Sequence, residues 1–423
     1  MNVLLIGSGG REHALALKFS ESTLLTKLFC APGNPGTNLI AQNIDLDIKN
    51  FSEIKRAILD NSIDMVVAGP EDPLVNGLRD FIEADFEISY VKFVGPDKRG
   101  AQLEGSKDVA KQFMSRYNIP TAKYNSYTKE QILDACAFLE TLNAPYVLKA
   151  DGLAGGKGVL IINEIEQAKQ ELVNMFEGKF GKAGEKVVIE EFLRGIELSV
   201  FILTDGKDYL ILPEAKDYKR VYDNDEGLNT GGMGAVSPVP FANKEFLKKV
   251  EDKIIIPTVN GLKSEGILYN GFVFIGLMNC DGEPFVIEYN VRMGDPETEV
   301  VVPRVKSDLL GHLAAMCDGK LSKEKIEILD NQALAVVCVS GGYPSDYHKG
   351  YVITGVNEIK NGIVFQAGTV SNEENLLTNG GRVLVITAFD RDIPLAREKV
   401  YNEIKKIKFH NIHYRLDIGN DLI

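Results

Sequence analysis

The chain has 423 residues, which at about 100–200 residues per domain predicts roughly three domains. Its 44% apolar and 25% charged residues are typical of a globular protein and exclude a wholly disordered chain. The net charge of −13 excludes a broad basic surface for nucleic acid or an anionic membrane, so any bound anion must be held by local groups.

Cysteine placement and the length of apolar runs indicate a cytoplasmic protein. The 5 cysteines are scattered without a C-x-x-C pair, as is typical of free thiols in a reducing compartment. The apolar run Val3–Ile6 is too short for a signal peptide, and no apolar segment reaches the ~20 residues of a membrane span. We therefore expect no nucleic-acid or membrane partner.

The first hundred residues alternate short apolar strands with helices. We predict strands at 2–6, 25–30, 65–68 and 92–94 and helices at 11–20 and 52–59. This alternation, with short Gly/Pro loops, indicates a parallel α/β sheet. Loops at 7–10, 31–37 and 69–71 leave the carboxyl ends of strands, the edge at which open α/β sheets bind ligands.

The rest of the chain has three recognisable stretches. After a predicted helix at 107–117, residues 122–190 follow the pattern strand, helix, strand, Gly-rich loop, strand, helix, strand. A polar, Gly-rich stretch lies at 217–237. The last ~90 residues carry short strands with Gly-Gly turns, which predicts a small α+β or partly barrel-like domain.

The loop Gly7-Ser8-Gly9-Gly10-Arg11-Glu12 resembles a dinucleotide fingerprint, but Glu12 stands at the position of the third glycine. The second strand also lacks the terminal acidic residue that binds a ribose diol. The turn still places backbone N–H groups and a helix N-terminus at a strand end, which is a usable anion site, and Arg11 adds a positive charge. The alternative is a tight turn that needs glycine for packing alone.

The loop DGLAGGKG at 151–158 is not a P-loop, because Lys157 is followed by Gly158 and a strand. A flexible hairpin that carries a lysine is suited to closing over a triphosphate. Lys149, two residues before the loop, would add a second positive charge. The alternative is an ordinary glycine-rich hairpin.

The strand predicted at 285–292 has one polar and one apolar face. Alternation puts Glu288, Asn290 and Arg292 on one face and residues 287, 289 and 291 on the other. Magnesium takes oxygen ligands, and arginine pairs with phosphate or carboxylate groups. The alternative is a solvated polar face, but the polar turn at 293–298 favours a functional one.

In combination these segments resemble the ATP-grasp superfamily and, within it, the phosphoribosylamine–glycine ligase family. The matching segments lie in order and span nearly the whole chain. They are GSGGREHALA at 7–16, GNPGT at 33–37, GPEDPL at 69–74, DGLAGGKGV at 151–159, EEFLRGIELS at 190–199, KDYKR at 216–220, NTGGMGA at 229–235, EYNVRMGDPETE at 288–299 and GGYPSDYHKG at 341–350.

The resemblance implies a multidomain α/β and α+β fold. We expect an N-terminal parallel α/β, Rossmann-like domain at 1–103 that binds a sugar phosphate. An ATP-grasp region at 104–330 would follow, with a mobile lid subdomain at about 122–190. A small mixed domain would occupy 331–423.

The implied activity is the ATP-dependent joining of glycine to 5-phosphoribosylamine through glycyl phosphate. The products would be glycinamide ribonucleotide, ADP and phosphate in de novo purine biosynthesis. ATP would be the co-substrate, Mg²⁺ or Mn²⁺ the metal, and the chain a monomer or weak dimer.

The resemblance also implies site residues. The ATP phosphates would contact Lys107, Lys149 and the loop of Gly152, Leu153, Ala154, Gly155, Gly156, Lys157 and Gly158. Adenine would contact Glu190, Phe192 and Leu193, and the ribose Glu197. The sugar phosphate would lie among Gly9, Gly10, Arg11, Glu12, Asn34, Pro35, Gly36, Thr37, Gly69, Pro70 and Glu71.

The metal ligands would be Glu288 and Asn290. Many ATP-grasp enzymes carry another metal-binding carboxylate on the preceding strand, but Phe272–Met278 contains no acid, which leaves the number of ions open. The groups expected around glycine and the transferring phosphate are Asp217, Lys219, Arg220 and Arg292, with Lys157 from the lid loop. By charge, Asp217 would meet the ammonium group and Arg292 the carboxylate or acyl phosphate.

Two alternatives stay open. One is another ATP-grasp enzyme that acts on a different purine intermediate or carboxylate. The other is a nucleotide-binding sensor that has lost catalysis, against which the polar face of 288–292 and the two lysines argue.

Overall fold

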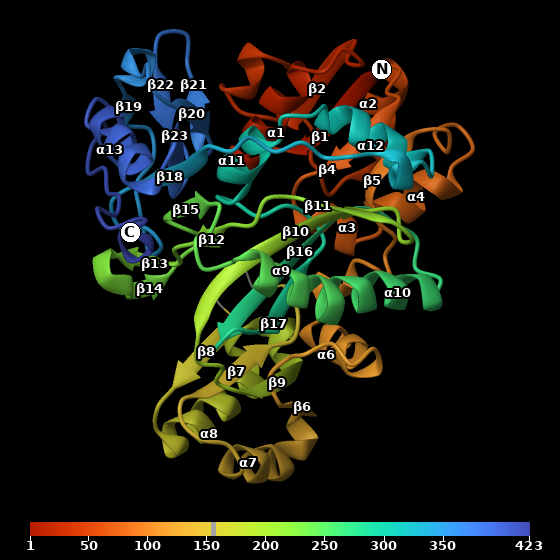
Figure 1. The fold of residues 1–423 in the computed structure, drawn as a ribbon, viewed down its shortest axis with the longest axis vertical. Coiled ribbons are helices and arrows are strands. Elements are labelled where there is room, and N and C mark those ends of the chain that lie inside the picture. Colours follow the sequence, from red (N-terminus) through yellow and green to blue (C-terminus); the bar gives the residue numbers. More distant parts are fainter. Residues whose placement is uncertain (154–157) are drawn as a thin grey trace.

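The computed structural model describes residues 1–153 and 158–423 (Figure 1). The N-terminal part is a parallel sheet, as the sequence predicts, and its strand order is β3-β2-β1-β4-β5. Its strands are β1 (Asn2–Gly7), β2 (Lys27–Pro32), β3 (Gln42–Asn43), β4 (Met65–Ala68) and β5 (Lys92–Pro96). Its helices are α1 (Gly10–Ser20), α2 (Phe51–Asp60), α3 (Glu71–Val75) and α4 (Leu78–Ala84). Because β2, β1 and β4 are neighbours, the three loops at their carboxyl ends meet at one edge.

This sheet continues into the central region, because the first residues of β16 pair with β5. The central strands are β10 (Ile196–Thr204), β11 (Tyr209–Ile211), β16 (Tyr269–Cys280) and β17 (Glu283–Asn290). Helices α9 (Lys244–Val250) and α10 (Ile256–Ser264) pack against the apolar side chains of β16 and β17 in one core. Helices α5 (Gln102–Gly105) and α6 (Lys107–Arg116) follow β5 in the chain and pack against β17.

A separate antiparallel sheet forms the lower lobe in Figure 1, in the order β6-β9-β7-β8. Its strands are β6 (Tyr124–Thr128), β7 (Tyr146–Ala150), β8 (Val159–Ile162) and β9 (Lys186–Glu191). Helices α7 (Ile132–Glu140) and α8 (Ile165–Asn174) pack on it and close a core of their own. The strands and helices predicted within 122–190 are therefore confirmed, and of the predicted loop at 151–158, residues 154–157 lie outside the described residues.

The C-terminal part is a mixed domain in which α13 (Ile393–Ile404) covers an antiparallel sheet. The sheet runs β12-β15-β18-β23-β20, so two strands from 216–237 extend it. Its strands are β12 (Lys216–Asp217), β15 (Gly234–Ser237), β18 (Gln332–Val339), β20 (Ile363–Gln366) and β23 (Arg382–Asp390). Smaller elements are β13 (Arg220–Tyr222), β14 (Glu226–Asn229), β19 (Val352–Ile353), β21 (Thr369–Ser371) and β22 (Leu376–Thr378).

Two further helices, α11 (Thr298–Val301) and α12 (Leu309–Cys317), lie between the central and C-terminal sheets in the chain. α11 packs against both α1 and the C-terminal sheet, so the three parts of the molecule meet there. Within residues 1–153 and 158–423, no helix is long and apolar enough to cross a membrane.

The predicted alternation along β17 is wrong at Ile287. The register between β16 and β17 shifts there, because Gly276 pairs with Glu288 while Leu277 pairs with Val286. This β-bulge makes Val286, not Ile287, the core residue before Tyr289. Ile287 instead lines a pocket beside Glu288.

Candidate functional site

The loop after β1 is organised by Glu12. Its carboxylate accepts a hydrogen bond from the Gly9 N–H (2.6 Å), which caps α1. A Cβ at Gly7 or Gly69 would collide with the same side chain. Glu12 therefore fills the space that a dinucleotide pyrophosphate would approach, in agreement with the incomplete fingerprint.

Arg11 is buried and turned inward. Its Nε pairs with Glu12 (2.5 Å), and its Nη1 donates to the Met293 carbonyl (3.3 Å). Burial alone would lower the pKa of Arg11, but Glu12 and Asp295 raise it well above its ordinary value. The positive charge at this loop is thus compensated inside the protein.

The loop after β2 is held by Asn34. Its side-chain N–H groups donate to Ser8 O (2.9 Å) and Gln366 O (2.8 Å), and its Oδ1 accepts from the N–H groups of Gly36 and Thr37. Thr37 is fully buried, and Pro35 is half-buried between them. The third loop contributes Pro70 as N-cap of α3 and Glu71 as its first residue.

Arg292 connects this edge of the N-terminal sheet to β17. Its Nη2 pairs with Glu104 (2.8 Å) and its Nε with Glu71 (3.4 Å). It also donates to Asn290 Oδ1 (3.3 Å) and to the Met293 carbonyl (3.2 Å). Burial raises the pKa of Glu104 to about 7, although Arg292 opposes the shift.

A group of lysines lies where the β6–β9 lobe and α6 approach β17. Lys149, on β7, pairs with Glu190 (2.9 Å) and donates to the Ile287 carbonyl (3.3 Å). Lys111, on α6, pairs with the other oxygen of Glu190 (2.9 Å). The Glu190 carboxylate, expected at adenine, is therefore engaged by two ammonium groups.

Other predicted nucleotide contacts surround these lysines. Lys107 Nζ donates to the Gly152 carbonyl (3.1 Å), and burial lowers the pKa of Lys107. Phe192 and Leu193 are half-buried immediately after β9. Leu153 is 37% exposed, and Gly158 O accepts from the Ala150 N–H. The remaining predicted loop residues, Ala154, Gly155, Gly156 and Lys157, lie outside the described residues.

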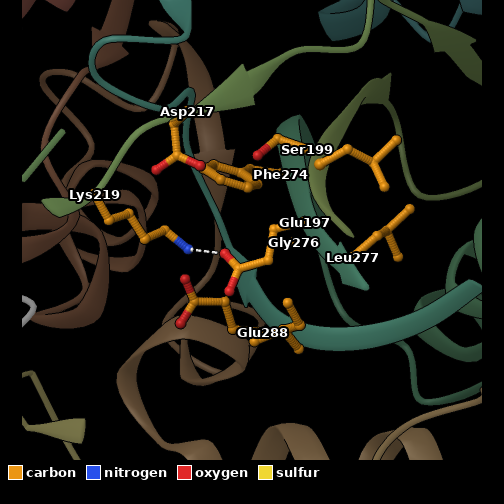
Figure 2. Close-up of a pocket in the computed structure, with 10 residues that line it drawn as sticks. Glu197, Ser199, Asp217, Lys219, Phe274, Gly276, Leu277 and Glu288 are labelled. Carbon is orange, nitrogen blue, oxygen red and sulfur yellow. Dashed lines mark hydrogen bonds and ion pairs between the residues drawn. The ribbon is translucent and has the colours of Figure 1, made fainter. Parts of the chain in front are cut away.

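A pocket opens between β10, β12, β16 and β17 (Figure 2). Lys219 pairs with Glu197 across it (2.7 Å), and Glu288 lies below this pair, while Asp217 and Ser199 lie at the other end. The lining residues are Glu197, Leu198, Ser199, Asp217, Lys219, Phe274, Gly276, Leu277, Ile287 and Glu288. Most of the polar groups predicted from 197–220 and 288–292 thus meet here.

Glu288 is the charged group at the foot of this pocket. Burial would raise its pKa, but Lys219, Lys149, Lys107 and Arg292 hold it below the ordinary value. Among the described residues, its carboxylate has no hydrogen-bond donor and no ion-pair partner. It is therefore an ionised carboxylate available to a ligand.

The donor set fits a hard divalent cation. Within the described part of the chain, no group of three or more His, Cys, Asp or Glu side chains is placed to hold a metal ion. Mg²⁺ needs fewer protein ligands, because it is usually bound through one or two carboxylates plus substrate phosphates. Glu288, with Asn290 two residues further along β17, supplies such oxygens. β16, opposite Glu288, has Gly276 at the paired position.

Arg220 is not among the residues that line the pocket. It donates to the Gly227 carbonyl (2.7 Å) within the β13–β14 hairpin. This contact could not be predicted from the position of Arg220 next to Lys219, because β13 begins at Arg220.

Several residues that the structure brings to the site are not predicted from the sequence. Lys111 follows Lys107 by one helical turn, and that i,i+4 spacing could have revealed it. Ser199 and Phe274 alternate with core residues on their strands and carry no separate signal. Glu104 and Glu297 are buried carboxyls beside Arg292 and Asp217.

Comparison with known proteins gives matches along nearly the whole chain. Family models for phosphoribosylglycinamide synthetase match at 1–104 (N domain), 105–298 (ATP-grasp domain) and 333–421 (C domain). A phosphoribosylamine–glycine ligase of Caldanaerobacter subterraneus is 43% identical over 420 residues, covering 99% of both chains.

Solved structures show the same likeness. The crystal structure of phosphoribosylamine–glycine ligase from Thermotoga maritima superimposes with a TM-score of 0.87 at 35% identity, covering 99% of this chain and 100% of that one. The biotin carboxylase domain of Hydrogenobacter thermophilus 2-oxoglutarate carboxylase, solved with MgADP and bicarbonate, reaches a TM-score of 0.73 at 16% identity. It covers 97% of this chain and 91% of that one, and at this identity it shows the fold alone.

Proposed function

The chain belongs to the phosphoribosylglycinamide synthetase family, whose members are ATP-dependent phosphoribosylamine–glycine ligases of purine biosynthesis, and on this premise we propose how its residues divide the reaction. The observation that carries the proposal is the ionised Glu288 carboxylate at the foot of the pocket. Four cationic groups surround it, and it has no donor among the described residues. Such a place suits a metal–triphosphate complex beside a small acid substrate.

A carboxylate is a poor electrophile, so amide formation in water requires its activation. We propose that the glycine carboxylate takes the γ-phosphoryl group of ATP, which gives glycyl phosphate and ADP. The neutral amine of phosphoribosylamine then attacks the acyl carbon, phosphate leaves, and the amine loses a proton. This chemistry depends on positioning and on charge neutralisation more than on covalent catalysis.

Glu288 and Asn290 would hold Mg²⁺ or Mn²⁺, which when bound would neutralise charge on the ATP phosphates. Lys149, on β7 of the β6–β9 lobe, and Lys107, at the start of α6, supply further positive charge near Glu288. Glu190 keeps Lys149 in place through their ion pair. Phe192 and Leu193 would contact adenine, and Glu197 the ribose.

The phosphoribosylamine would lie at the edge where the loops after β1, β2 and β4 meet. Arg292 reaches this edge through Glu71 and also borders Asn290, so it lies between the sugar side and the metal side. Asp217 and Lys219 would face glycine from the opposite wall of the pocket.

We also propose the organisation inferred from sequence: domains at 1–103, 104–330 and 331–423, with a lid at about 122–190. The separate core of the β6–β9 lobe supports its movement as one unit. A cytoplasmic location and a monomeric or weakly dimeric state complete the proposal.

The test is ADP release with ATP, magnesium and glycine, with and without phosphoribosylamine formed in situ from ribose 5-phosphate and ammonia. ADP formation that needs both glycine and the sugar amine is expected. ADP formation that is independent of glycine would favour another acid substrate. ATP binding without turnover under any of these conditions would favour a sensor.

A further inference from the structure

The two ends of the pocket in Figure 2 differ in the charged groups around them. The Glu288 end is surrounded by Lys219, Lys149, Lys107 and Arg292. The other end carries Asp217 and Ser199. Lys219 faces Asp217 and opposes the rise in the pKa of Asp217, but its ion pair is with Glu197 (2.7 Å). Among the described residues, Asp217 has no cation at ion-pair distance.

A second carboxyl lies directly behind this end. Glu297 belongs to the turn between β17 and α11, is 3% exposed, and accepts a hydrogen bond from Ser199 Oγ (3.5 Å). Its carboxyl is folded over Gly294, where a Cβ would collide with it. The turn therefore holds Glu297 against the back of the pocket wall, and no described cation pairs with it.

The charged groups around Glu297 come from several elements. Asp217 and Lys219 face it from the β12 segment, Arg292 from the turn after β17, Glu299 from α11 and Arg382 from β23. Burial and then Asp217 raise the pKa of Glu297 to about 8, and burial likewise raises the pKa of Asp217. Two neighbouring buried carboxyls of this kind retain a proton near neutrality.

We propose that Asp217 and Glu297 act as a pair that receives the ammonium group of glycine, with Asp217 in contact and Glu297 as a positioning residue behind Ser199. Glycine is a zwitterion, so its carboxylate would then point to the cation-rich end at Glu288. The arriving ammonium replaces the proton held by the pair, and that proton is released to solvent. This inference rests on the proposed function, because it assumes that glycine is the acid substrate.

The pair makes glycine binding pH-dependent in one direction. Below about pH 8 the proton competes with the ammonium group, so the KM for glycine should fall about tenfold for each pH unit on the way up to that value. The KM for ATP should not follow this trend, because the Glu288 end does not contain the pair.

The decisive variant is Glu297→Gln, which keeps the size of the side chain. With saturating ATP and phosphoribosylamine, we expect about a tenfold or larger rise in the glycine KM at about pH 8.5, a flat pH profile below it, and a little-changed kcat. The matched control is Glu299→Gln. Glu299 is a fully buried carboxyl two residues further on that lies against Gly10 and is not among the residues that line the pocket.

An unchanged glycine KM and pH profile in Glu297→Gln would overturn the inference, as would an equal change in Glu299→Gln. If Glu297→Gln does not fold, calorimetry on the wild-type chain decides. Glycine binding in buffers of different ionisation enthalpy at about pH 7 should show proton release, and its absence would overturn the pair. Loss of the glycine requirement in the wild-type chain would instead refute the proposed function.

Discussion

The backbone N–H of Gln366, at the end of β20, donates a hydrogen bond to Nδ1 of His13 on α1 (2.9 Å). The carbonyl of the same Gln366 accepts a hydrogen bond from the Asn34 side chain (2.8 Å). One residue of the C-terminal domain therefore fixes both the first helix and the loop after β2. The C-terminal domain thus contributes to the order of the edge at which we place the sugar phosphate.

The His13 contact predicts a loss of stability in acid. Burial lowers the pKa of His13 from 6.5 to about 4, and Nδ1 must stay unprotonated to accept the N–H. The unfolded chain takes up the proton as pH falls below 6.5, so the stabilisation is complete above that value and lost by about pH 4. At about 1.4 kcal/mol per pH unit, the loss is of order 3 kcal/mol.

Urea unfolding between about pH 7 and 4.5 measures this loss. The matched variant is His13→Asn, whose side-chain oxygen can accept the same N–H without titrating. We expect the variant to lose less stability than the wild-type chain over this range. An identical pH dependence in both would exclude His13 as the responsible group.

The Arg11–Glu12 pair predicts a second stability effect. Removing one charge of a buried pair leaves the other without a partner, which costs about 3–5 kcal/mol. Arg11→Met should therefore lower the melting temperature strongly, and adding Glu12→Gln should recover part of the loss. A double-mutant cycle by thermal unfolding measures the coupling. A sugar-binding defect in Arg11→Met at unchanged stability would instead point to direct contact with the substrate.

Much of the fold can be predicted from this sequence because its signals are local. Apolar strands such as Met65–Ala68 and the Gly/Pro loops after them have the pattern of a parallel α/β unit, and the structure confirms both. The addition of β12 and β15 to the C-terminal sheet has no such signal, because it depends on pairing with β18, about 100 residues away. The bulge at Ile287 is likewise invisible to a period-two pattern.

The residues of the candidate site also include some that local sequence signals predict and some that they do not. Glu288 and Asn290 could be selected from strand spacing, and Lys149 from its place before a Gly-rich loop. The ion pairs could not, since Glu190 is predicted at adenine, and its pairing with Lys149 and Lys111 appears only in the folded structure. For Arg220 the sequence suggests a role shared with Lys219, whereas its side chain donates to the Gly227 carbonyl in the β13–β14 hairpin. Its contact with substrate stays a prediction.

The third prediction concerns the effect of Glu288 on turnover. Glu288→Gln should keep the fold, because no described donor loses its partner, but should lower kcat by about 100-fold or more through loss of a metal ligand. The magnesium concentration needed for half-maximal ADP release should rise as well. The control is Glu283→Gln on the same strand, whose carboxylate pairs with Lys249 and Lys253 at the surface. Near-normal turnover of Glu288→Gln at saturating magnesium would contradict the role.

The last prediction compares Lys149 and Lys111. Both pair with the Glu190 carboxylate, but their other contacts differ. Lys149 also reaches the Ile287 carbonyl and lies near Glu288. Lys111 is 2% exposed, donates to Thr121 Oγ1 (2.8 Å) and lies over the Tyr124 ring. Lys149 is thus directed at the proposed phosphate site, and Lys111 at the connection between α6 and the lobe.

We expect Lys149→Met to lower kcat/KM for ATP by about 100-fold with a modest effect on stability, because a phosphate-facing charge is lost. Lys111→Met should lower the melting temperature more and kcat/KM for ATP less, because it breaks a buried contact outside the pocket. Thermal unfolding and ATP titration of both variants at about pH 7 measure the contrast, since burial lowers the pKa of Lys111 to about 8 and leaves it mostly charged there. Equal losses of ATP affinity in the two variants would mean that Glu190, and not Lys149 alone, orders the nucleotide site.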